Sequence, residues 1–489
     1  MQQCPLKLPK ELKIQSNGGK QENDDDDDDG VEPVSPTGQY LNSKALNSFI
    51  LAILESQVPI DYLYVSTQLR HLLLPINTRF SSIMVLDKKG VKQWKRVEIK
   101  LEDHIKIHIF KDGLSIESYD NYLDEYLTKL AMDPLPQDKP LWEFHIFNYP
   151  TRNAPAHAIF KLHHALGDGY SLMGSLLSCA RRTDNPSLPL TFPIPKTKTN
   201  DPVKLKGGCM SLLPNTLCAI CETVADFGAS FVIPSWNEDD ITPIRNIKEE
   251  SNFKYPLHIS TLGLSLDQIK LIKTKLGTTV NDTVSGILFL GIRLYMQGCD
   301  MKYRKSRSTA MVMFNTRNIR GYMSVEEMIN ANTKIWGNKF TYLQIKLPKL
   351  IDSKYLNPLD FVYEAKKQIA RCRNSPKIHL NVKRLEFLRK HKGSEAAAEK
   401  IRSKLKQSSM AITNIVGPVQ RISLANHPVK GMYFMPTGCP QSLVITIMSY
   451  MQTLRIGLGI EKGFIDSEKL KSSIQKAFEL IYEAATKSS

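Results

Sequence analysis

The chain has 489 residues, of which 42% are hydrophobic and 23% charged, and its formal net charge is +16 at pH 7. This balance excludes a wholly disordered chain and a multi-span membrane protein, and the length suits two domains. The positive charge favours an anionic partner, and nucleic acid, an anionic membrane face and a phosphate-bearing cofactor all fit it.

Residues 1–35 have the composition of a disordered acidic tail. They mix Lys, Gly and Asn with six aspartates at 24–29, and such a segment buries too little apolar surface to offset the entropy lost on folding. Residues 1–30 also lack the apolar core of a secretory signal peptide. The eight cysteines, including an isolated CxxC pair at Cys218 and Cys221, therefore indicate plain thiols in a reducing compartment.

Residues 36–190 mix helical and strand patterns and are predicted to form an N-terminal domain. Its predicted helices cover residues 45–54, 119–131 and 170–182. Its predicted strands lie within residues 94–109, 141–147 and 156–163.

Residues 191–255 are rich in proline and lysine, which is typical of a crossover between domains. The apolar segment 207–233 inside it contains Pro214, Glu222 and Asp226, so we expect a helix on a membrane surface or packed in protein, not a secure span.

Residues 256–489 are predicted to form a C-terminal domain. Its predicted helices cover residues 265–276, opened by Ser265 or Asp267, residues 281–297 and a final stretch around 470–481. Its predicted strands cover residues 310–315, 341–347, 411–416, 442–450 and 454–460. The uncharged run 431–454 is interrupted by prolines and is predicted to be a loop followed by a strand.

The stretch with the clearest chemistry is KLHHALGDGYSL at 161–172. His163 and His164 end a predicted strand, and Asp168 precedes a predicted helix, where a carboxylate suits the exposed backbone amides. Histidine is well matched to removing a proton near neutral pH because its ordinary pKa is about 6.5. Since neighbouring strand residues point to opposite faces, we expect one histidine to react and the other to support it.

The histidine pair by itself leaves three interpretations open: proton transfer, a structural role, or a metal site. Zinc needs three protein ligands, and no third one is nearby, so no metal site is predicted. The chain has no GxSxG nucleophile elbow, which argues against a serine esterase, and its DFG at 226–228 lacks the other kinase motifs.

The heptapeptide HHALGDG at 163–169 resembles the HHxxxDG motif of the plant branch of the wax ester synthase/diacylglycerol acyltransferase family. Three further stretches follow the family's order, namely KPLWEFH at 139–145, VND at 280–282 and TNIVGP at 413–418. The resemblance implies an α/β (α+β) fold of two chloramphenicol acetyltransferase-like domains, with mixed sheets and a tunnel at their interface.

The same resemblance implies roles for the motif residues. His164 would act as general base on the acceptor hydroxyl, and would return the proton to the leaving thiolate without an acyl-enzyme. His163 would support it through a hydrogen bond. Asp168 would orient the loop by pairing with an arginine; Arg317 is the candidate partner, and an exposed surface arginine is the alternative.

Three more residues are candidates. Asn281 either donates a hydrogen bond to the developing oxyanion or caps the helix that follows. Gly169 is assigned to substrate binding together with its motif. Trp142 is a candidate for the tunnel wall, although core packing is favoured for an aromatic residue in an apolar strand.

The resemblance thus implies an acyl-CoA-dependent O-acyltransferase for long-chain fatty alcohols and diacylglycerol, with acyl-CoA as a substrate and no cofactor. We expect a membrane surface as partner and no nucleic acid, because the basic residues are dispersed without a binding motif. The expected location is the cytosolic face of the endoplasmic reticulum membrane, with the plasma membrane as a second site. Two alternatives stay open: a BAHD-like acyltransferase with a soluble acceptor, whose DFGWG motif is absent here, and a non-catalytic lipid-binding protein of the same fold.

Overall fold

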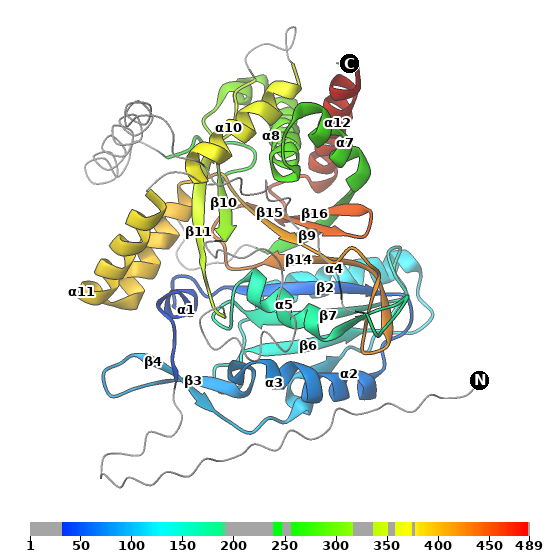
Figure 1. Ribbon diagram of the computed structural model, residues 1–489, viewed down its shortest axis with the longest axis vertical. Helices are drawn as coiled ribbons and strands as arrows, with labels where there is room; N and C mark the ends of the chain where they lie inside the picture. Colours follow the sequence, from blue (N-terminus) through cyan, green and yellow to red (C-terminus); the bar gives the residue numbers. More distant parts are fainter. Residues whose placement is uncertain are drawn as a thin grey trace, which may run out of the picture.

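The computed structural model describes residues 32–188, 190, 238–246, 256–315, 336–350, 357–373 and 377–487. Figure 1 shows two sheets, one above the other, with helices packed on their outer sides. Both sheets are mixed, so the α/β fold with two domains that was predicted is confirmed.

The lower sheet has seven strands. In spatial order they are β5 (Ile105–Ile107), β6 (Trp142–Phe147), β7 (Ala156–His163), β2 (Phe49–Ser56), β14 (His427–Pro436), β13 (Ile422–Leu424) and β8 (Ala180–Arg182). β5 is parallel to β6, and the other neighbouring pairs are antiparallel. Because β13 and β14 follow most of the second domain in sequence, the C-terminal part of the chain completes the first sheet.

Helices and a small sheet surround the lower sheet. The helices are α1 (Pro36–Leu41), α2 (Tyr62–Gln68), the π-helix η1 (Leu69–Leu73), α3 (Leu74–Ile76), α4 (Ile116–Met132) and α5 (Gly169–Ser178), with 3-10 turns at η2 (Thr78–Ser81) and η3 (Leu101–Asp103). The small sheet consists of β1 (Glu32–Pro33), β4 (Lys92–Arg96) and β3 (Ser82–Leu86).

The upper sheet has six strands. In spatial order they are β11 (Phe340–Lys346), β10 (Thr309–Asn315), β12 (Met410–Val416), β15 (Leu443–Tyr450), β16 (Thr453–Glu461) and β9 (Leu257–Ser265). β12 is parallel to both of its neighbours, and the outer pairs are antiparallel.

The apolar helix α8 (Val280–Cys299) lies at the centre of the helical layer above this sheet (Figure 1). The other elements of the second domain are α7 (Leu266–Leu276), η4 (Met301–Lys305), α10 (Leu359–Arg373), α11 (Lys377–Lys406) and α12 (Ser467–Lys487). Ser265 accepts a hydrogen bond from the backbone N–H of Gln268 and caps α7, which confirms one of the two predicted helix starts.

A separate apolar core joins the two domains. It contains residues of both sheets and of α4, among them Leu51, Ile53, Leu127, Ile259 and Val444. Burial of this surface favours one fixed arrangement of the sheets. An ion pair between Glu55 of β2 and Arg455 of β16 crosses the same interface, and the Glu55 side chain is only 2% exposed.

Most of the predicted elements are confirmed, with three corrections. Residues 45–54 were expected to be a helix, but residues 49–56 form β2. This strand is buried along its whole length, and a continuous apolar run does not distinguish a fully buried strand from a buried helix. The helix predicted to run to residue 182 ends at Ser178 and gives way to β8. The uncharged run starts in strand β14, and the loop expected there comes after it.

The predicted acidic tail and crossover fall largely outside the described residues, and so does the apolar segment 207–233. Residues 32–35, which the tail prediction included, form β1 and the N-cap of α1, with Glu32 paired to Arg79 at 2.7 Å. Among the helices that the structure describes, none combines the length and apolarity that crossing a bilayer requires.

Candidate active site

The histidine motif connects the end of β7 to the start of α5. The strand ends at His163, and Asp168 caps the helix by accepting a hydrogen bond from the backbone N–H of Ser171 at 3.1 Å. His164 and Asp168 are each only 4% exposed, and His163 is fully buried. The sequence thus brings two imidazoles and a carboxylate into one buried turn.

Both ring nitrogens of His163 are engaged in hydrogen bonds. Nδ1 accepts from the backbone N–H of Ala165 at 3.0 Å, so it carries no proton. The proton of the neutral ring is therefore on Nε2, which donates to Oδ1 of Asn47 at 3.0 Å. His163 is thus bonded to Asn47 and Ala165, and its supporting role towards His164 stays a prediction.

His164 has the opposite tautomer. Its Nδ1 lies 3.0 Å from Oδ1 of Asn338, while Nδ2 of the same amide donates to the backbone carbonyl of His164 at 2.8 Å. A carbonyl only accepts, so the amide orientation is fixed and Nδ1 must carry the proton. Nε2 then has an available lone pair, and no hydrogen-bond partner of Nε2 is found in the part of the chain that the structure describes.

Burial lowers the pKa of His164 below its ordinary value of 6.5. Asp168, the backbone carbonyl of His164 and Asn338 act in the opposite direction. The lowered pKa keeps the imidazole neutral near pH 7, which is the state that can accept a proton. The Phe340 ring packs against the imidazole, with 5.4 Å between the ring centroids.

A segment of the second domain that the sequence did not point to forms hydrogen bonds with the histidine motif. Residues 336–340, WGNKF, lead into β11 of the second domain, and each of the first four contacts the motif or the start of α5. Trp336 Nε1 donates to the carbonyl of Leu166 at 2.7 Å, and Lys339 N donates to Oδ2 of Asp168 at 2.8 Å. The signal in the sequence was a tryptophan, a glycine and an asparagine in a row, with two residues between them and a predicted strand.

Asn281 lies at the start of α8 but does not cap it. Thr279 is the N-cap, and its side chain and that of Asp282 form a reciprocal capping box. The Asn281 side chain instead accepts a hydrogen bond from Nδ2 of Asn414 in β12, at 3.4 Å. Helix capping, one of the two roles predicted for Asn281, is thus performed by Thr279. The hydrogen bond from Asn414 also brings the VND and TNIVGP motifs together.

The remaining candidates are placed as follows. Gly169 is the first residue of α5 and lies against Ile415 of the TNIVGP motif. Trp142 is fully buried in β6, where it stacks on His104 and donates to the carbonyl of Phe80 at 2.9 Å; this is core packing, which the sequence also favoured over a tunnel wall. Arg317 lies outside the described residues, so its pairing with Asp168 stays a prediction.

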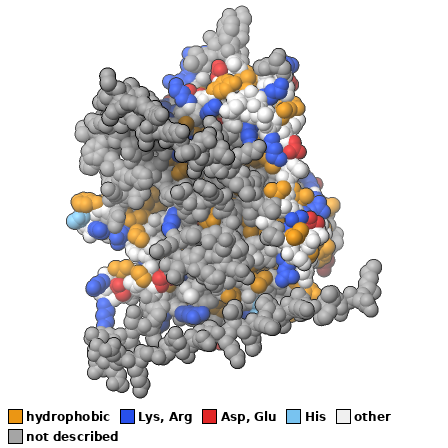
Figure 2. All heavy atoms as spheres, in the orientation of Figure 1, with side chains coloured by type: hydrophobic (Ala, Val, Ile, Leu, Met, Phe, Trp, Pro, Cys, Tyr) orange, Lys and Arg blue, Asp and Glu red, His pale blue; other side chains and the backbone are white. Residues whose placement is uncertain are grey.

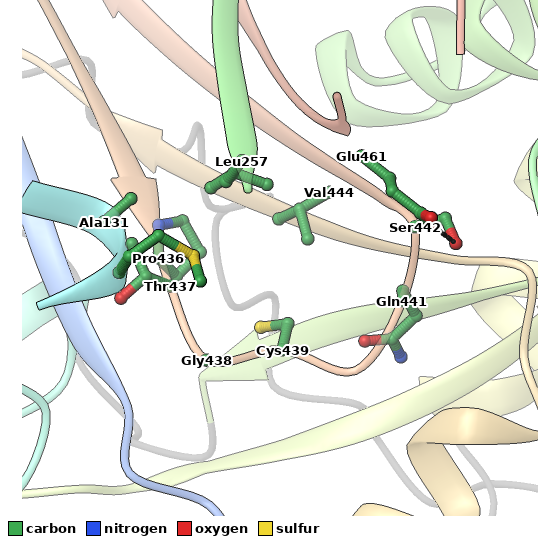
Figure 3. Close-up of a pocket in the computed structure, with 11 residues that line it drawn as sticks. Ala131, Leu257, Pro436, Thr437, Gly438, Cys439, Gln441, Ser442, Val444 and Glu461 are labelled. Atoms are coloured by element: carbon green, nitrogen blue, oxygen red, sulfur yellow. Dashed lines mark hydrogen bonds between the residues drawn. The ribbon is translucent and has the colours of Figure 1, made fainter. Parts of the chain in front are cut away.

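A pocket of about 440 Å³, part of it open to solvent, lies at the crossover from β14 to β15 (Figure 3). Thr437 and Gly438 line it, and Thr437 also contacts the start of β2: Thr437 N donates to the carbonyl of Phe49 at 2.7 Å, and Ser48 Oγ donates to the carbonyl of Thr437 at 2.8 Å. Phe49 pairs with His163 in the sheet. The pocket therefore adjoins the strands that carry the histidine pair.

No three His, Cys, Asp or Glu side chains among the described residues are grouped so that they could hold a metal ion.

Family models match most of the chain. The model described as the wax ester synthase/diacylglycerol acyltransferase catalytic domain matches residues 69–284, and the one described as the WS/DGAT C-terminal domain matches residues 336–482. Wax ester synthase/diacylglycerol acyltransferase 11 of Arabidopsis thaliana is 27% identical over 93% of this chain and 95% of its own length. Wax ester synthase/diacylglycerol acyltransferase 5 of the same plant is 29% identical, over 90% of this chain and 91% of its own.

Solved structures share the fold. The wax ester synthase/diacylglycerol acyltransferase from Marinobacter aquaeolei VT8 has a TM-score of 0.58 at 15% identity, over 93% of this chain and 100% of that one. The first condensation domain of the CDA synthetase has a TM-score of 0.52 at 12% identity, over 92% of this chain and 93% of that one.

The two-domain fold, matched by these structures, is the chloramphenicol acetyltransferase-like fold, and with its catalytic-domain match the protein is an acyltransferase. The chain belongs to the wax ester synthase/diacylglycerol acyltransferase family.

Proposed function

We propose that this acyltransferase moves a long-chain acyl group from acyl-CoA to the hydroxyl of a fatty alcohol, which yields a wax ester, and also to diacylglycerol, which yields triacylglycerol. His164 is the general base. The family and the names of the Arabidopsis relatives support this substrate class, and acyl-CoA is consumed as a substrate.

The observation that carries this proposal is the difference between the two histidines. His163 uses both ring nitrogens in hydrogen bonds, whereas His164 uses Nδ1 and retains the lone pair of Nε2. A general base needs a ring nitrogen whose lone pair is not already engaged in a hydrogen bond. His164 meets this requirement, and His163 does not.

The chemistry is direct transfer without a covalent enzyme intermediate. The alcohol oxygen attacks the thioester carbonyl while Nε2 of His164 takes the hydroxyl proton, so the new C–O bond forms through a tetrahedral oxyanion. The C–S bond then breaks, and Nε2–H returns the proton to the thiolate of coenzyme A. The negative charge of Asp168 favours the imidazolium that exists between these two proton transfers.

Asn281 is our candidate donor to the oxyanion. The amide oxygen of Asn281 accepts a hydrogen bond from Asn414, and Thr279 and Asp282 cap α8. The amide nitrogen of Asn281 takes part in neither interaction and can donate to the oxyanion. A correctly placed donor of this kind contributes on the order of 3 kcal/mol to transition-state stabilisation.

We further propose that the enzyme works at the cytosolic face of the endoplasmic reticulum membrane, where its apolar substrates dissolve. The net charge of +16 suits an anionic membrane surface and the phosphates of coenzyme A. Lys and Arg side chains are spread among apolar ones over the described part of the face in Figure 2.

The experiment is a competition assay with the purified protein, labelled palmitoyl-CoA, hexadecanol and a soluble phenolic alcohol. We expect labelled wax ester as the main product, and labelled triacylglycerol when dioleoylglycerol replaces hexadecanol. Acylation of the soluble alcohol in preference to hexadecanol would instead support the BAHD-like alternative. Binding of acyl-CoA without turnover of any acceptor would refute the proposal.

A further inference from the structure

We infer that Asn338 is a positioning residue that sets the tautomer of the catalytic histidine. It holds the Nδ1 proton of His164 and thereby directs the basic lone pair to Nε2. This inference rests on the proposed role of His164 as general base.

Two hydrogen bonds, together called the clip, join the side-chain amide of Asn338 to His164. Asn338 Oδ1 accepts from His164 Nδ1, and Asn338 Nδ2 donates to the His164 carbonyl. Since the carbonyl requires a donor, the amide cannot rotate to offer Nδ2 to the ring without losing that bond and placing its own oxygen, a second acceptor, against the carbonyl. The clip therefore excludes the tautomer with a proton on Nε2, which could not act as a base.

The clip is rigid because the segment around Asn338 is fixed on both sides. Trp336 donates to the Leu166 carbonyl, and Lys339 N donates to Asp168. Gly337 has φ of +105°, a conformation that favours glycine, and its carbonyl accepts from Ser171 Oγ at 3.2 Å. These three contacts fix the amide relative to the imidazole to which it bonds.

The clip also joins the two domains at the reacting group. His164 belongs to the lower sheet, whereas Asn338 comes two residues before β11 at the edge of the upper sheet, which in Figure 1 reaches down to the level of α5. The basic form of His164 is thus complete only when the second domain is docked.

The hydrogen bond persists through the reaction. When Nε2 takes the proton of the alcohol, Nδ1–H remains bonded to Asn338 Oδ1, so the positive charge of the imidazolium is met by an amide oxygen already in place. Preorganised dipoles of this type stabilise developing charge without reorganisation.

The test compares two variants of Asn338 with a matched control. Asn338→Leu removes both hydrogen bonds at similar volume, and Asn338→Asp keeps an acceptor at Nδ1 and adds negative charge. The control is Asn148→Leu. The Asn148 amide likewise accepts one hydrogen bond and donates another to a single residue, here the backbone N–H and carbonyl of Ile60, at 2.8 and 2.9 Å. We assign Asn148 no part in the chemistry. Ester formation is measured as kcat and KM from pH 5 to 9.

For Asn338→Leu we expect kcat to fall roughly 10²-fold, with KM for acyl-CoA changed less than about threefold. For Asn338→Asp we expect measurable activity with the acidic limb of the pH profile moved to higher pH, since a carboxylate at Nδ1 stabilises the imidazolium. Asn148→Leu should keep the wild-type pH profile, whatever stability it loses.

The inference is overturned if Asn338→Leu keeps wild-type kcat, or if Asn338→Asp is active with an unmoved acidic limb. If Asn338→Leu fails to fold, the Asn338→Asp profile alone decides. His164→Ala in the same assay separates the two claims: an inactive His164→Ala beside a fully active Asn338→Leu would refute only the role of Asn338, and an active His164→Ala would refute the general base itself.

Discussion

Gly169 and Ile415 are in contact across the two domains, and a side chain on Gly169 would collide with the tip of the Ile415 side chain. A Cβ added to Gly169 would lie 2.7 Å from Cδ1 and 3.4 Å from Cγ1 of Ile415. A larger residue at position 169 therefore has to displace the Ile415 side chain, in the turn that also carries Asp168.

Gly169→Ala is expected to lower stability by about 1–3 kcal/mol through overpacking and to reduce ester formation, because relief of the clash moves the start of α5. Thermal unfolding and initial rates measure the two effects. The double variant Gly169→Ala with Ile415→Val removes the clashing Cδ1 and should recover part of both. Equal loss in the single and double variants would show that the clash with Ile415 is not the cause.

Asp168 is expected to matter more for the rate than an ordinary helix cap. Its two oxygens accept from the backbone N–H groups of Ser171 and Lys339, so Asp168→Ala leaves one buried and one half-buried donor unsatisfied and costs about 1–3 kcal/mol. The matched control is Ser265→Ala, which removes the cap of α7 and should cost about 1 kcal/mol without a change in kcat. Equal kcat in the two variants would contradict the positioning of the histidine turn by Asp168.

The sequence allowed the local parts of the site to be predicted. Histidines at a strand end, Asp168 before a helix and Ser265 at a helix start all follow from rules that act over a few residues, and the structure has them where expected. The KPLWEFH, VND and TNIVGP stretches were likewise placed on the correct strands and helix.

What could not be predicted depends on contacts between distant residues. Asn338 is 174 residues from His164 in the chain, and a single asparagine in irregular backbone carries no signal of its partner. β2 was mistaken for a helix because both of its faces are covered, by elements whose position the sequence does not reveal. The addition of β14 to the first sheet is also a long-range pairing, with β2.

The Glu55 and Arg455 side chains, which form an ion pair between the two domains, are expected to be strongly coupled in their effect on the free energy of unfolding. Arg455→Met leaves the buried Glu55 carboxylate without its partner, and we expect a loss of about 3 kcal/mol in unfolding free energy. Adding Glu55→Gln should restore much of this loss because the buried charge is then gone. Denaturant titration of the two single variants and the double variant measures the coupling, and additive losses would contradict it.

The buried His157 is expected to destabilise the protein in mild acid. Burial lowers the pKa of His157 to about 4, from an ordinary value of 6.5. Between these values the unfolded chain binds a proton that the folded chain does not, so stability falls as the pH drops from 6.5 towards 4. His157→Gln should lose less stability than the wild type between pH 7 and 5 in thermal unfolding. An unchanged pH dependence in this variant would rule out His157 as a contributor.

The most direct test of the account is the rate of wax ester formation by purified His164→Ala, with labelled palmitoyl-CoA and hexadecanol at saturating concentrations. His391→Ala serves as the control, because His391 is an exposed histidine on α11. With His164 as the general base, kcat of His164→Ala falls roughly 10²- to 10⁴-fold while its thermal unfolding stays cooperative, and the control keeps the wild-type rate. A folded His164→Ala protein that forms ester within about threefold of the wild-type rate would contradict the central claim.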